Sequence, residues 1–537
     1  MTRRLIFFVF IAAGMLRADV LDEVHAYILS RLRANQEAVA PSAKCGFREV
    51  MELRQFFPQL SPQWQKLAKP LLEMPKRQYQ VVSPSRHFTL HYDLTGIHAV
   101  PSKDSLGNGI PDYIDSAAVI LDHVWDVEIN RLGFRPPPDS TGQPVQSYPV
   151  FFSSMSYYGL TNFNMQEDIP ELPGQNYVSY LELHRNFSGG GFATNGLQAL
   201  KVTAAHEFHH AIQLGYQFRW KWDGPYLIYP DLFFMEMSST FMEDYVYDSI
   251  NDYVQYVNKF LPVADAKPFN VTDNNSEYAN SLYLHMLTKL HGIEIFRQIW
   301  ETIIRYPALD ALDLVLKKYD DSFPKSFNQY ACWLYFSGHH ADSLHYFKDG
   351  HLFTDLEVSR DITKLNEDLG AYQMRHVRIL LDAPGVYRAK ISCPSNLGRM
   401  SHVTNAQSVQ QSVPFNREQF FTQSNRYPLI VVLTNGYDAA IRNISYQVSL
   451  APAMIEQNPV VVTQSASEVR FINVPLQAEI KIFNVLGQLV TTLRTGANDV
   501  VSWNFTNRQQ YRLSSGAYFY LITAKQFKKA GRFILVR

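Results

Sequence analysis

Four residues that can bind a metal or move a proton lie within the stretch TAAHEFHHAIQ: His206, Glu207, His209 and His210. On a helix, His206 and His210 are four residues apart, so their rings project from one face and can converge on one metal ion. Glu207 follows the first histidine and can reach a water molecule on that metal. This H-E-x-x-H spacing predicts two zinc ligands and an acid/base residue, whereas the alternative is the polar face of a surface helix.

A third ligand is needed, because catalytic zinc uses three protein ligands and keeps one position open. Glu236 lies 26 positions after His210, on the next expected helix and among apolar neighbours. An ionised carboxylate in such surroundings needs a partner, so Glu236 is a candidate ligand rather than a solvated helix residue. Glu243, two turns further on, is the alternative ligand, or else it accepts a hydrogen bond from a ligand histidine. His209 is expected to be a core or supporting residue.

The chemistry that such a site predicts is hydrolysis. Zinc lowers the pKa of its water from about 15.7 toward about 7. Glu207 is expected to take the proton and later deliver it to the leaving amine. The oxyanion needs a further donor, for which Tyr278 is the first candidate and Tyr283 the second, although either tyrosine can instead belong to the core.

Strands and helices that can position these residues are evident from the apolar spacing. Strands are expected over residues 86–94, 148–155 and 176–184, and helices over residues 111–134, 196–215, 233–250, 278–292 and 293–306. A few strands followed mainly by helices predict an α+β domain, which we place at residues 81–360.

The remaining sequence predicts further parts on both sides of this domain. Residues 1–18 combine a positive start at Arg3 and Arg4, an apolar run and a small-residue end, which is typical of a secretory signal peptide. Residues 19–80 are expected to be helical and are a candidate propeptide. Short strands separated by Gly, Asn and Pro predict a β-sandwich over 361–455 and a second, small one over 456–537.

Composition narrows the function classes. The formal net charge of the 537 residues is -1, so no nucleic-acid partner is expected, and no later stretch is apolar enough to cross a membrane after signal removal. Cys45, Cys332 and Cys393 are far apart in the sequence, so no thiolate metal cluster is expected. One disulfide or three buried free thiols both remain open.

The segments AAHEFHHAIQLGY and FMEMSSTFMEDYVYDSINDY together resemble gluzincin metallopeptidases, and more closely a bacterial family of secreted metalloproteases. The resemblance implies a zincin-like fold, with His206, His210 and Glu236 as zinc ligands and Glu207 as the catalytic acid/base. The second segment departs from the family pattern, since Met237 stands where the family favours Gly. This departure leaves the substrate open.

The same family carries an acidic element upstream, which here reads DSLGNGIPDYID. The resemblance implies a calcium site formed by Asp104, Asn108, Asp112 and Asp115, whose oxygens suit Ca²⁺. Leu106 stands where another acid is expected. The alternative is a turn that starts a helix, with acidic residues favoured in its first turn.

The C-terminal segments IKIFNVLGQLV, VSWNF, LSSGAYFYLI and GRFILVR resemble the type A sorting domain of type IX secretion. This implies export through the periplasm of a Gram-negative bacterium, recognition by the outer-membrane type IX machinery, and a secreted or surface protein. The leading hypothesis is thus a secreted zinc metallopeptidase with protein or peptide substrates. The alternatives are a catalytically inactive, surface-displayed binding or adhesion protein, and an adhesin in which zinc only braces helices.

Overall fold

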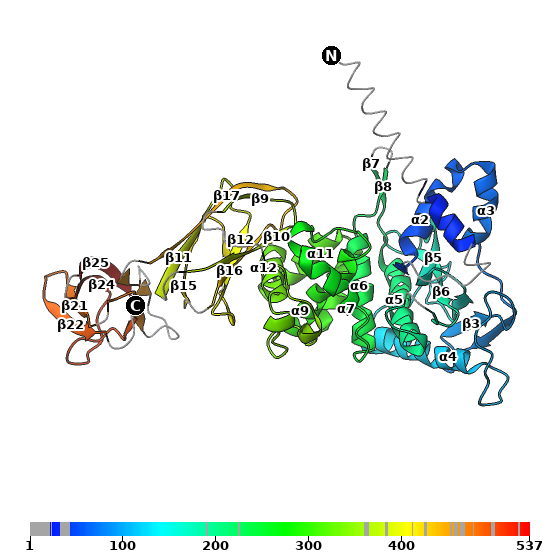
Figure 1. Cartoon of the computed structure of the whole chain (residues 1–537), viewed down its shortest axis with the longest axis horizontal. Coiled ribbons are helices and arrows are strands. Elements are labelled where there is room, and N and C mark those ends of the chain that lie inside the picture. Colours follow the sequence, from blue (N-terminus) through cyan, green and yellow to red (C-terminus); the bar gives the residue numbers. More distant parts are fainter. Residues whose placement is uncertain are drawn as a thin grey trace, which may run out of the picture. The chain divides into compact units, whose positions relative to one another are not determined.

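The computed structural model divides the chain into two compact units (Figure 1). One unit contains residues 1–323 and 336–356, and the other contains residues 324–335 and 357–537. The structure describes residues 22, 24–32, 43–189, 192–223, 226–358, 365–381, 385–410, 412–423, 427–451, 454–455, 460–461, 468–475, 477–495, 500–524 and 527–537. The expected signal peptide, residues 1–18, lies outside these ranges.

The first unit is built on a six-stranded sheet with the order β1-β5-β6-β4-β3-β2. Its strands are β1 (Ala43–Cys45), β2 (Tyr79–Val82), β3 (Phe88–Tyr92), β4 (Tyr148–Ser153), β5 (Tyr157–Asp168) and β6 (Tyr177–His184). Strands β3, β4 and β6 are parallel neighbours, whereas β5 runs antiparallel to β6. The short strand β1 pairs in parallel with β5, so β5 lies next to the edge of the sheet.

Helices pack on this sheet and continue beyond it (Figure 1). They are α4 (Asp112–Trp125) with its π-helical continuation η2 (Asp126–Arg131), α5 (Gly196–Tyr216), α6 (Leu232–Val246), α7 (Val254–Phe260), η3 (Leu261–Ala266), α8 (Ser276–Ala279), α9 (Ser281–His291), α10 (Glu294–Ile303), α11 (Ala308–Leu316), η4 (Lys317–Tyr319), η5 (Gly338–His340) and η6 (Gly350–Leu352). A hairpin of β7 (Lys221–Asp223) and β8 (Tyr226–Ile228) separates α5 from α6. Helix α5 packs against β5, β6, α4, α6 and α10, and this central position explains why it is buried on all sides after its first turn.

The N-terminal region is part of the first unit. The helix over residues 24–32, α2 (Phe47–Phe56), η1 (Phe57–Gln59) and α3 (Pro62–Leu72) share a hydrophobic cluster with Tyr157 of β5 and with Met155, which lies between β4 and β5. The sequence predicted helix throughout residues 19–80, but β1 and β2 are strands. Both lie at the ends of the sheet order, where pairing with a neighbouring strand satisfies their backbone hydrogen-bonding groups. The spacing of apolar side chains does not reveal such pairing.

The second unit is rich in strands, apart from α12 (Phe323–Leu334), which lies in the range expected for the α+β domain. One pair of sheets contains β9 (Leu365–Leu369), β10 (Met374–Ile379), β11 (Gly385–Ser392), β12 (Arg399–Thr404), β13 (Ser408–Val409), β14 (Val413–Pro414), β15 (Glu418–Gln423), β16 (Leu429–Thr434) and β17 (Ile441–Leu450). A second pair contains β18 (Met454–Ile455), β19 (Val460–Val461), β20 (Val469–Ile472), β21 (Glu479–Asn484), β22 (Leu489–Arg494), β23 (Val501–Trp503), β24 (Gly516–Ala524) and β25 (Phe527–Val536). Each pair encloses its own hydrophobic core. A mixed α+β protein of several parts with a β-rich C-terminal region was expected, and the structure has this architecture.

Helices long and apolar enough to cross a bilayer are absent from the described ranges.

Candidate metal centre

Four buried side chains from three elements converge in the first unit. Cys45 comes from the end of β1, His206 and His210 come from α5, and Glu236 comes from α6. One potential ligand atom of each residue lies within 4.8 Å of those of the other three. Because sulfur, imidazole nitrogen and carboxylate oxygen are all metal ligands, the cluster can hold a metal ion.

The ligand atoms on α5 and α6 point at one another. Glu236 Oε2 lies 3.2 Å from His206 Nε2 and 3.3 Å from His210 Nε2. All three atoms are buried and none has a hydrogen-bond partner. Buried polar atoms in folded proteins are normally satisfied, so three such atoms facing one point indicate a group that the protein itself does not supply.

The outer nitrogen of each histidine is held by a hydrogen-bond acceptor. His206 Nδ1 lies 2.7 Å from Glu243 Oε1, and His210 Nδ1 lies 2.8 Å from Gln213 Oε1. Gln213 is fixed in turn, because its Nε2 donates to the carbonyl of Met235 at 3.0 Å. A proton on Nδ1 leaves the lone pair of Nε2 directed into the cluster, which is the tautomer that a metal ligand requires.

The charges within the cluster are strongly coupled. Burial alone would lower the pKa of His206, but the adjacent carboxylates of Glu236 and Glu243 outweigh it and raise that pKa to about 10. Burial likewise opposes ionisation of Glu236, yet the adjacent imidazoles of His210 and His206 lower its pKa to about 2. The carboxylate of Glu236 is therefore stabilised by positive charge on the imidazoles, and a bound cation can supply that charge when the imidazoles are neutral.

Glu207 lies beside the cluster, against strand β5. Its Oε2 is 2.8 Å from Thr161 Oγ1, while its Oε1 is buried without a hydrogen-bond partner. Burial raises the pKa of Glu207 above its usual value, against the opposing charges of His206 and His210. Gly159 makes this position available, because a Cβ at residue 159 would lie 2.9 Å from Glu207 Cγ. A carboxyl group held there can exchange protons with a molecule bound at the cluster.

Cys45 is the member of the cluster that the sequence did not reveal. No thiolate metal cluster was expected because the cysteines are far apart. The sequence left open one disulfide or three buried free thiols, and in the structure all three thiols are free, with Cys45 and Cys332 buried and Cys393 half-buried. A metal site of this kind, however, needs only one cysteine. Burial and the neighbouring carboxylates of Glu207 and Glu236 hold the pKa of Cys45 well above its usual value, whereas a coordinated metal ion deprotonates a thiol outright. Only the pairing of β1 with β5 brings Cys45 next to the histidines.

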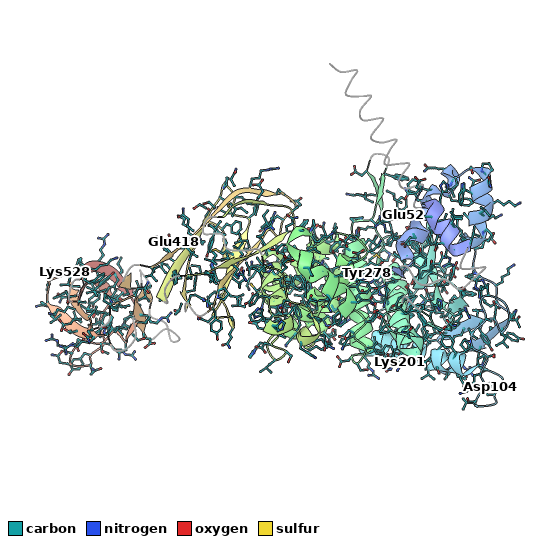
Figure 2. The ribbon with its side chains drawn as sticks, viewed as in Figure 1. Glu52, Asp104, Lys201, Tyr278, Glu418 and Lys528 are labelled. Atoms are coloured by element: carbon teal, nitrogen blue, oxygen red, sulfur yellow. The ribbon has the colours of Figure 1, made fainter. Side chains whose placement is uncertain are left out.

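The two tyrosines proposed as oxyanion donors differ in their surroundings. Tyr278 is buried on α8, and its ring centroid lies 6.2 Å from that of His206 (Figure 2). Tyr283 on α9 is fully buried against Phe269, at a ring separation of 5.0 Å, and belongs to the core. The structure thus brings Tyr278 near the cluster.

His209 faces away from the cluster, as its register on the helix implies. Its Nδ1 lies 2.7 Å from Glu128 Oε2 on η2, and its ring stacks on Phe296 at 5.4 Å. Burial raises the pKa of Glu128 and lowers that of His209, so the pair is stable in its uncharged form.

The acidic loop proposed for calcium lies elsewhere in the first unit, where Figure 2 labels Asp104 apart from Tyr278. Its oxygens already accept hydrogen bonds: Asp104 from the backbone of Gly107 and Gly109, at 2.7 and 2.9 Å, and Asp112 from the backbone of Ser105 at 2.7 Å. Asn108 Nδ2 donates to Asp115 at 3.1 Å. The calcium site stays a prediction, since these contacts equally describe a turn that starts α4.

Comparison with known proteins places the cluster within a recognised region of sequence. Residues 192–329 match a family of unknown function (DUF6055), and this range contains His206, Glu207, His210, Glu236 and Tyr278 but not Cys45. No curated protein matches the chain.

Among solved structures, three similarities are local. PorZ, an essential bacterial surface component of the type-IX secretion system of Porphyromonas gingivalis, shares 21% identity over 16% of this chain and 11% of its own, with a TM-score of 0.15. Dimeric latent PorU from the same bacterium shares 15% identity over 34% of this chain and 19% of its own, with a TM-score of 0.15. The adhesin domain of Epf from Streptococcus pyogenes shares 11% identity over 30% of this chain and 71% of its own, with a TM-score of 0.14. What the comparisons establish is that the residues around the cluster resemble the DUF6055 family over 192–329.

Proposed function

We propose that the first unit is a zincin-like, zinc-dependent metallopeptidase that hydrolyses protein or peptide substrates. The observation that carries this proposal is the convergence of three buried ligand atoms without hydrogen-bond partners, from His206, His210 and Glu236, beside the buried carboxyl group of Glu207. The spacing suits zinc. Zinc bonds to nitrogen and oxygen of 2.0–2.2 Å place two ligand atoms of a tetrahedral site roughly 3.3 Å apart.

The protein residues have distinct roles in this proposal. Glu243 and Gln213 orient the two imidazoles, and Glu207 holds the proton taken from water and returns it to the leaving amine. Thr161 fixes one oxygen of Glu207, which leaves the other oxygen for proton transfer. Tyr278 is the candidate donor to the developing oxyanion. When bound, zinc acts as a Lewis acid that polarises a carbonyl group and acidifies water.

The second candidate is a structural metal site. Such a site would belong to a non-catalytic binding or adhesion protein. Cys45 favours it, because a thiol, two imidazoles and a carboxylate form a complete set of four ligands, as in closed structural zinc sites. The two candidates differ in the role of Glu207. A catalytic site needs this residue as a general base, whereas a structural site does not.

The test therefore compares two variants of the full chain, Cys45→Ala and the double variant Cys45→Ala, Glu207→Gln. For each variant, zinc content and cleavage of peptides are measured. We expect both forms to bind zinc, and loss of the general base to lower cleavage of a peptide library by about 10²–10⁴-fold. Zinc binding without cleavage by Cys45→Ala, across the whole library, would contradict the peptidase and support the structural site.

We propose export as part of the same function. The signal-peptide pattern of residues 1–18 and the sorting-domain segments support passage through the periplasm of a Gram-negative bacterium to the surface or beyond, by way of the type IX machinery. Those segments form β21 to β25 of the last pair of sheets. Deletion of residues 456–537 is expected to retain the protein in the periplasm, as cell fractionation would show.

A further inference from the structure

Consecutive residues of the N-terminal region contact the metal cluster or its supports. Lys44 Nζ lies 2.9 Å from Glu243 Oε2, on the carboxylate that orients His206. Cys45 supplies the fourth potential ligand atom. Phe47 stacks on the ring of His210, with centroids 4.7 Å apart and planes 7° apart. A segment that meets the cluster at Lys44, Cys45 and Phe47 covers it directly.

The same segment also fills an edge of the sheet. Cys45 pairs with Gly159 of β5, and the next backbone N–H, of Gly46, donates to the carbonyl of Gly159 at 3.1 Å. Gly159 is the residue on which Glu207 packs. A strand edge next to the catalytic residue is where an extended peptide can bind by strand addition, and β1 occupies that place.

We propose that Cys45 is a removable fourth ligand and that the segment carrying it keeps the peptidase latent. This inference rests on the proposed function. The sulfur takes the position that solvent needs, and β1 takes the edge that an extended substrate needs. Opening breaks the metal–sulfur bond. The sulfur leaves with its electron pair and takes up a proton from solvent, which restores the thiol and frees both places.

The cysteine does not stand alone in this argument. His206 Nε2, His210 Nε2 and Glu236 Oε2 are unpartnered, and their residues are at most 4% exposed. They face the point that Cys45 completes. The salt bridge of Lys44 with Glu243 and Asp252, at 2.9 and 2.6 Å, anchors the segment in a register that places Cys45 at this point.

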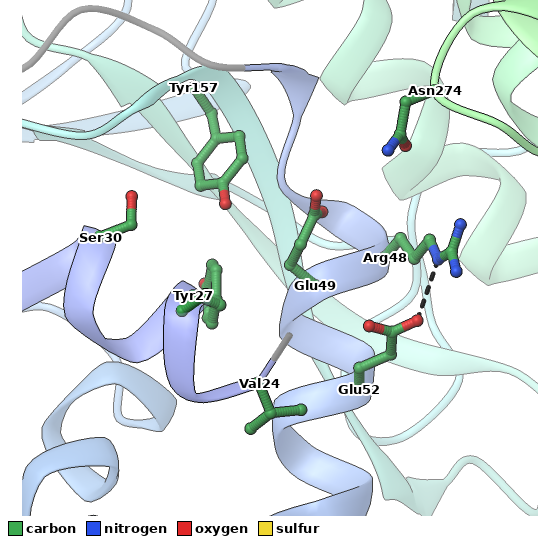
Figure 3. Close-up of a pocket in the computed structure, with 9 residues that line it drawn as sticks. Val24, Tyr27, Ser30, Arg48, Glu49, Glu52, Tyr157 and Asn274 are labelled. Atoms are coloured by element: carbon green, nitrogen blue, oxygen red, sulfur yellow. Dashed lines mark hydrogen bonds and ion pairs between the residues drawn. The ribbon is translucent and has the colours of Figure 1, made fainter. Parts of the chain in front are cut away.

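Two cavities interrupt the packing around the segment. A cavity of about 380 Å³ lies between the N-terminal region and the rest of the first unit, lined by side chains that include Tyr27, Glu49, Glu52, Tyr157 and Asn274 (Figure 3). A second cavity, of about 310 Å³, lies along the same boundary and is lined by residues that include Arg31 and Glu182. Arg31 and Glu182 are joined by a buried ion pair of 3.0 Å, so release of the segment must break this pair as well as the contacts of Lys44.

Ligation is tested first, by zinc X-ray absorption on the full chain and on Cys45→Ala. We expect one sulfur neighbour at about 2.3 Å from zinc in the wild type and none in the variant. Cys393→Ala is the matched control, because Cys393 lies in the second unit, and its spectrum should equal that of the wild type. A wild-type spectrum without sulfur would overturn the proposal.

Latency is tested next, by cleavage of a peptide library by the same three proteins. We expect Cys45→Ala to cleave about tenfold faster than the wild type or more, because activity follows the fraction of molecules whose site is open. Equal cleavage by wild type and variant would overturn latency while the peptidase stands. If no form cleaves any peptide, the proposed function itself fails. If Cys45→Ala loses its zinc, the thiol is a permanent structural ligand and latency is wrong.

Discussion

His206 and His209 lie three residues apart on α5, and each has its Nδ1 2.7 Å from a buried carboxylate oxygen, of Glu243 and Glu128 respectively. Both Nε2 atoms are buried without a hydrogen-bond partner. The surroundings of Nε2 differ. His206 meets a second imidazole nitrogen and the oxygen of Glu236, whereas His209 lies against the rings of Phe296 and Trp300.

This difference shows what makes a metal site. The Nε2 atom of His209 is a single unpartnered nitrogen among aromatic rings. It does not form a metal site, because no other ligand atom faces it. Around His206, several unpartnered ligand atoms converge. They can form a binding site, because a single cation can satisfy all of them. The register of α5 decides between the two, since residues 206 and 210 share a face that residue 209 does not.

The largest expected difference is in metal content. His206→Ala should lower zinc affinity by more than 100-fold, because even the loss of an outer hydrogen-bond partner costs about 10–100-fold. His209→Ala should keep its zinc, which metal analysis after dialysis would show. Zinc loss from the His209 variant, or zinc retention by the His206 variant, would contradict the assignment of His206 as a ligand and His209 as a core residue.

Stability should respond in the opposite order. His209→Ala leaves a cavity and deprives buried Glu128 of its partner, so we expect the free energy of unfolding of the first unit to fall by about 3 kcal/mol. Urea denaturation of the zinc-free proteins measures this. An unchanged midpoint would mean that the His209 pair is not a core contact.

The carboxylates on the Nδ1 side sharpen the comparison further. Glu243→Gln should weaken zinc binding about tenfold, because the neutral amide orients His206 but no longer supports its basicity. Glu128→Gln is the matched control and should leave the zinc affinity unchanged. Competition with a chelator of known affinity measures both, and equal affinities in all three proteins would contradict a supporting role for Glu243.

A third carboxyl group, of the half-buried Glu49, has a buried Oε2 without a hydrogen-bond partner. Burial above all, with help from the nearby Glu52 carboxylate, raises its pKa to about 7 from 4.5. Since the folded pKa is raised, the protonated form stabilises the fold fully below pH 4.5, and this contribution is lost as pH rises to about 7. The contribution of Glu49 to the melting temperature of the wild type should therefore fall over this range. Glu49→Gln should reduce the fall, and a variant with the same pH profile as the wild type would contradict the assignment.

The smallest effect is expected in the loop around Asp104, where the carboxylate is exposed and already satisfied. Asp104→Ala should cost about 1 kcal/mol or less, the net value of its hydrogen bonds, and leave the zinc content unchanged. Loss of a calcium-dependent rise in melting temperature in this variant would instead support the calcium prediction.

The sequence predicted the parts of the site that one helix or its neighbour provides. His206, Glu207 and His210 follow from helical spacing, and Glu236 stands out as a charge among apolar residues. The strands over 86–94, 148–155 and 176–184 and the long helices were predicted correctly because their apolar periodicity is strong.

The rest depends on pairing that periodicity does not report. Strand β5 was missed, since Gly159 and its polar residues interrupt the alternation of a strand. Strand β1 has only three residues, and it forms because β5 offers an edge. Cys45 therefore reaches residues more than 150 positions away in the sequence through a contact that only the folded sheet creates.

The central claim is that His206, His210 and Glu236 surround one zinc ion. The most direct test is a crystal structure of the full chain with an anomalous difference map at the zinc absorption edge. We predict one strong peak at about 2.0–2.2 Å from the two Nε2 atoms and from a carboxylate oxygen of Glu236. The contradicting result is a map without a peak there, with the three side chains hydrogen-bonded to one another or to water.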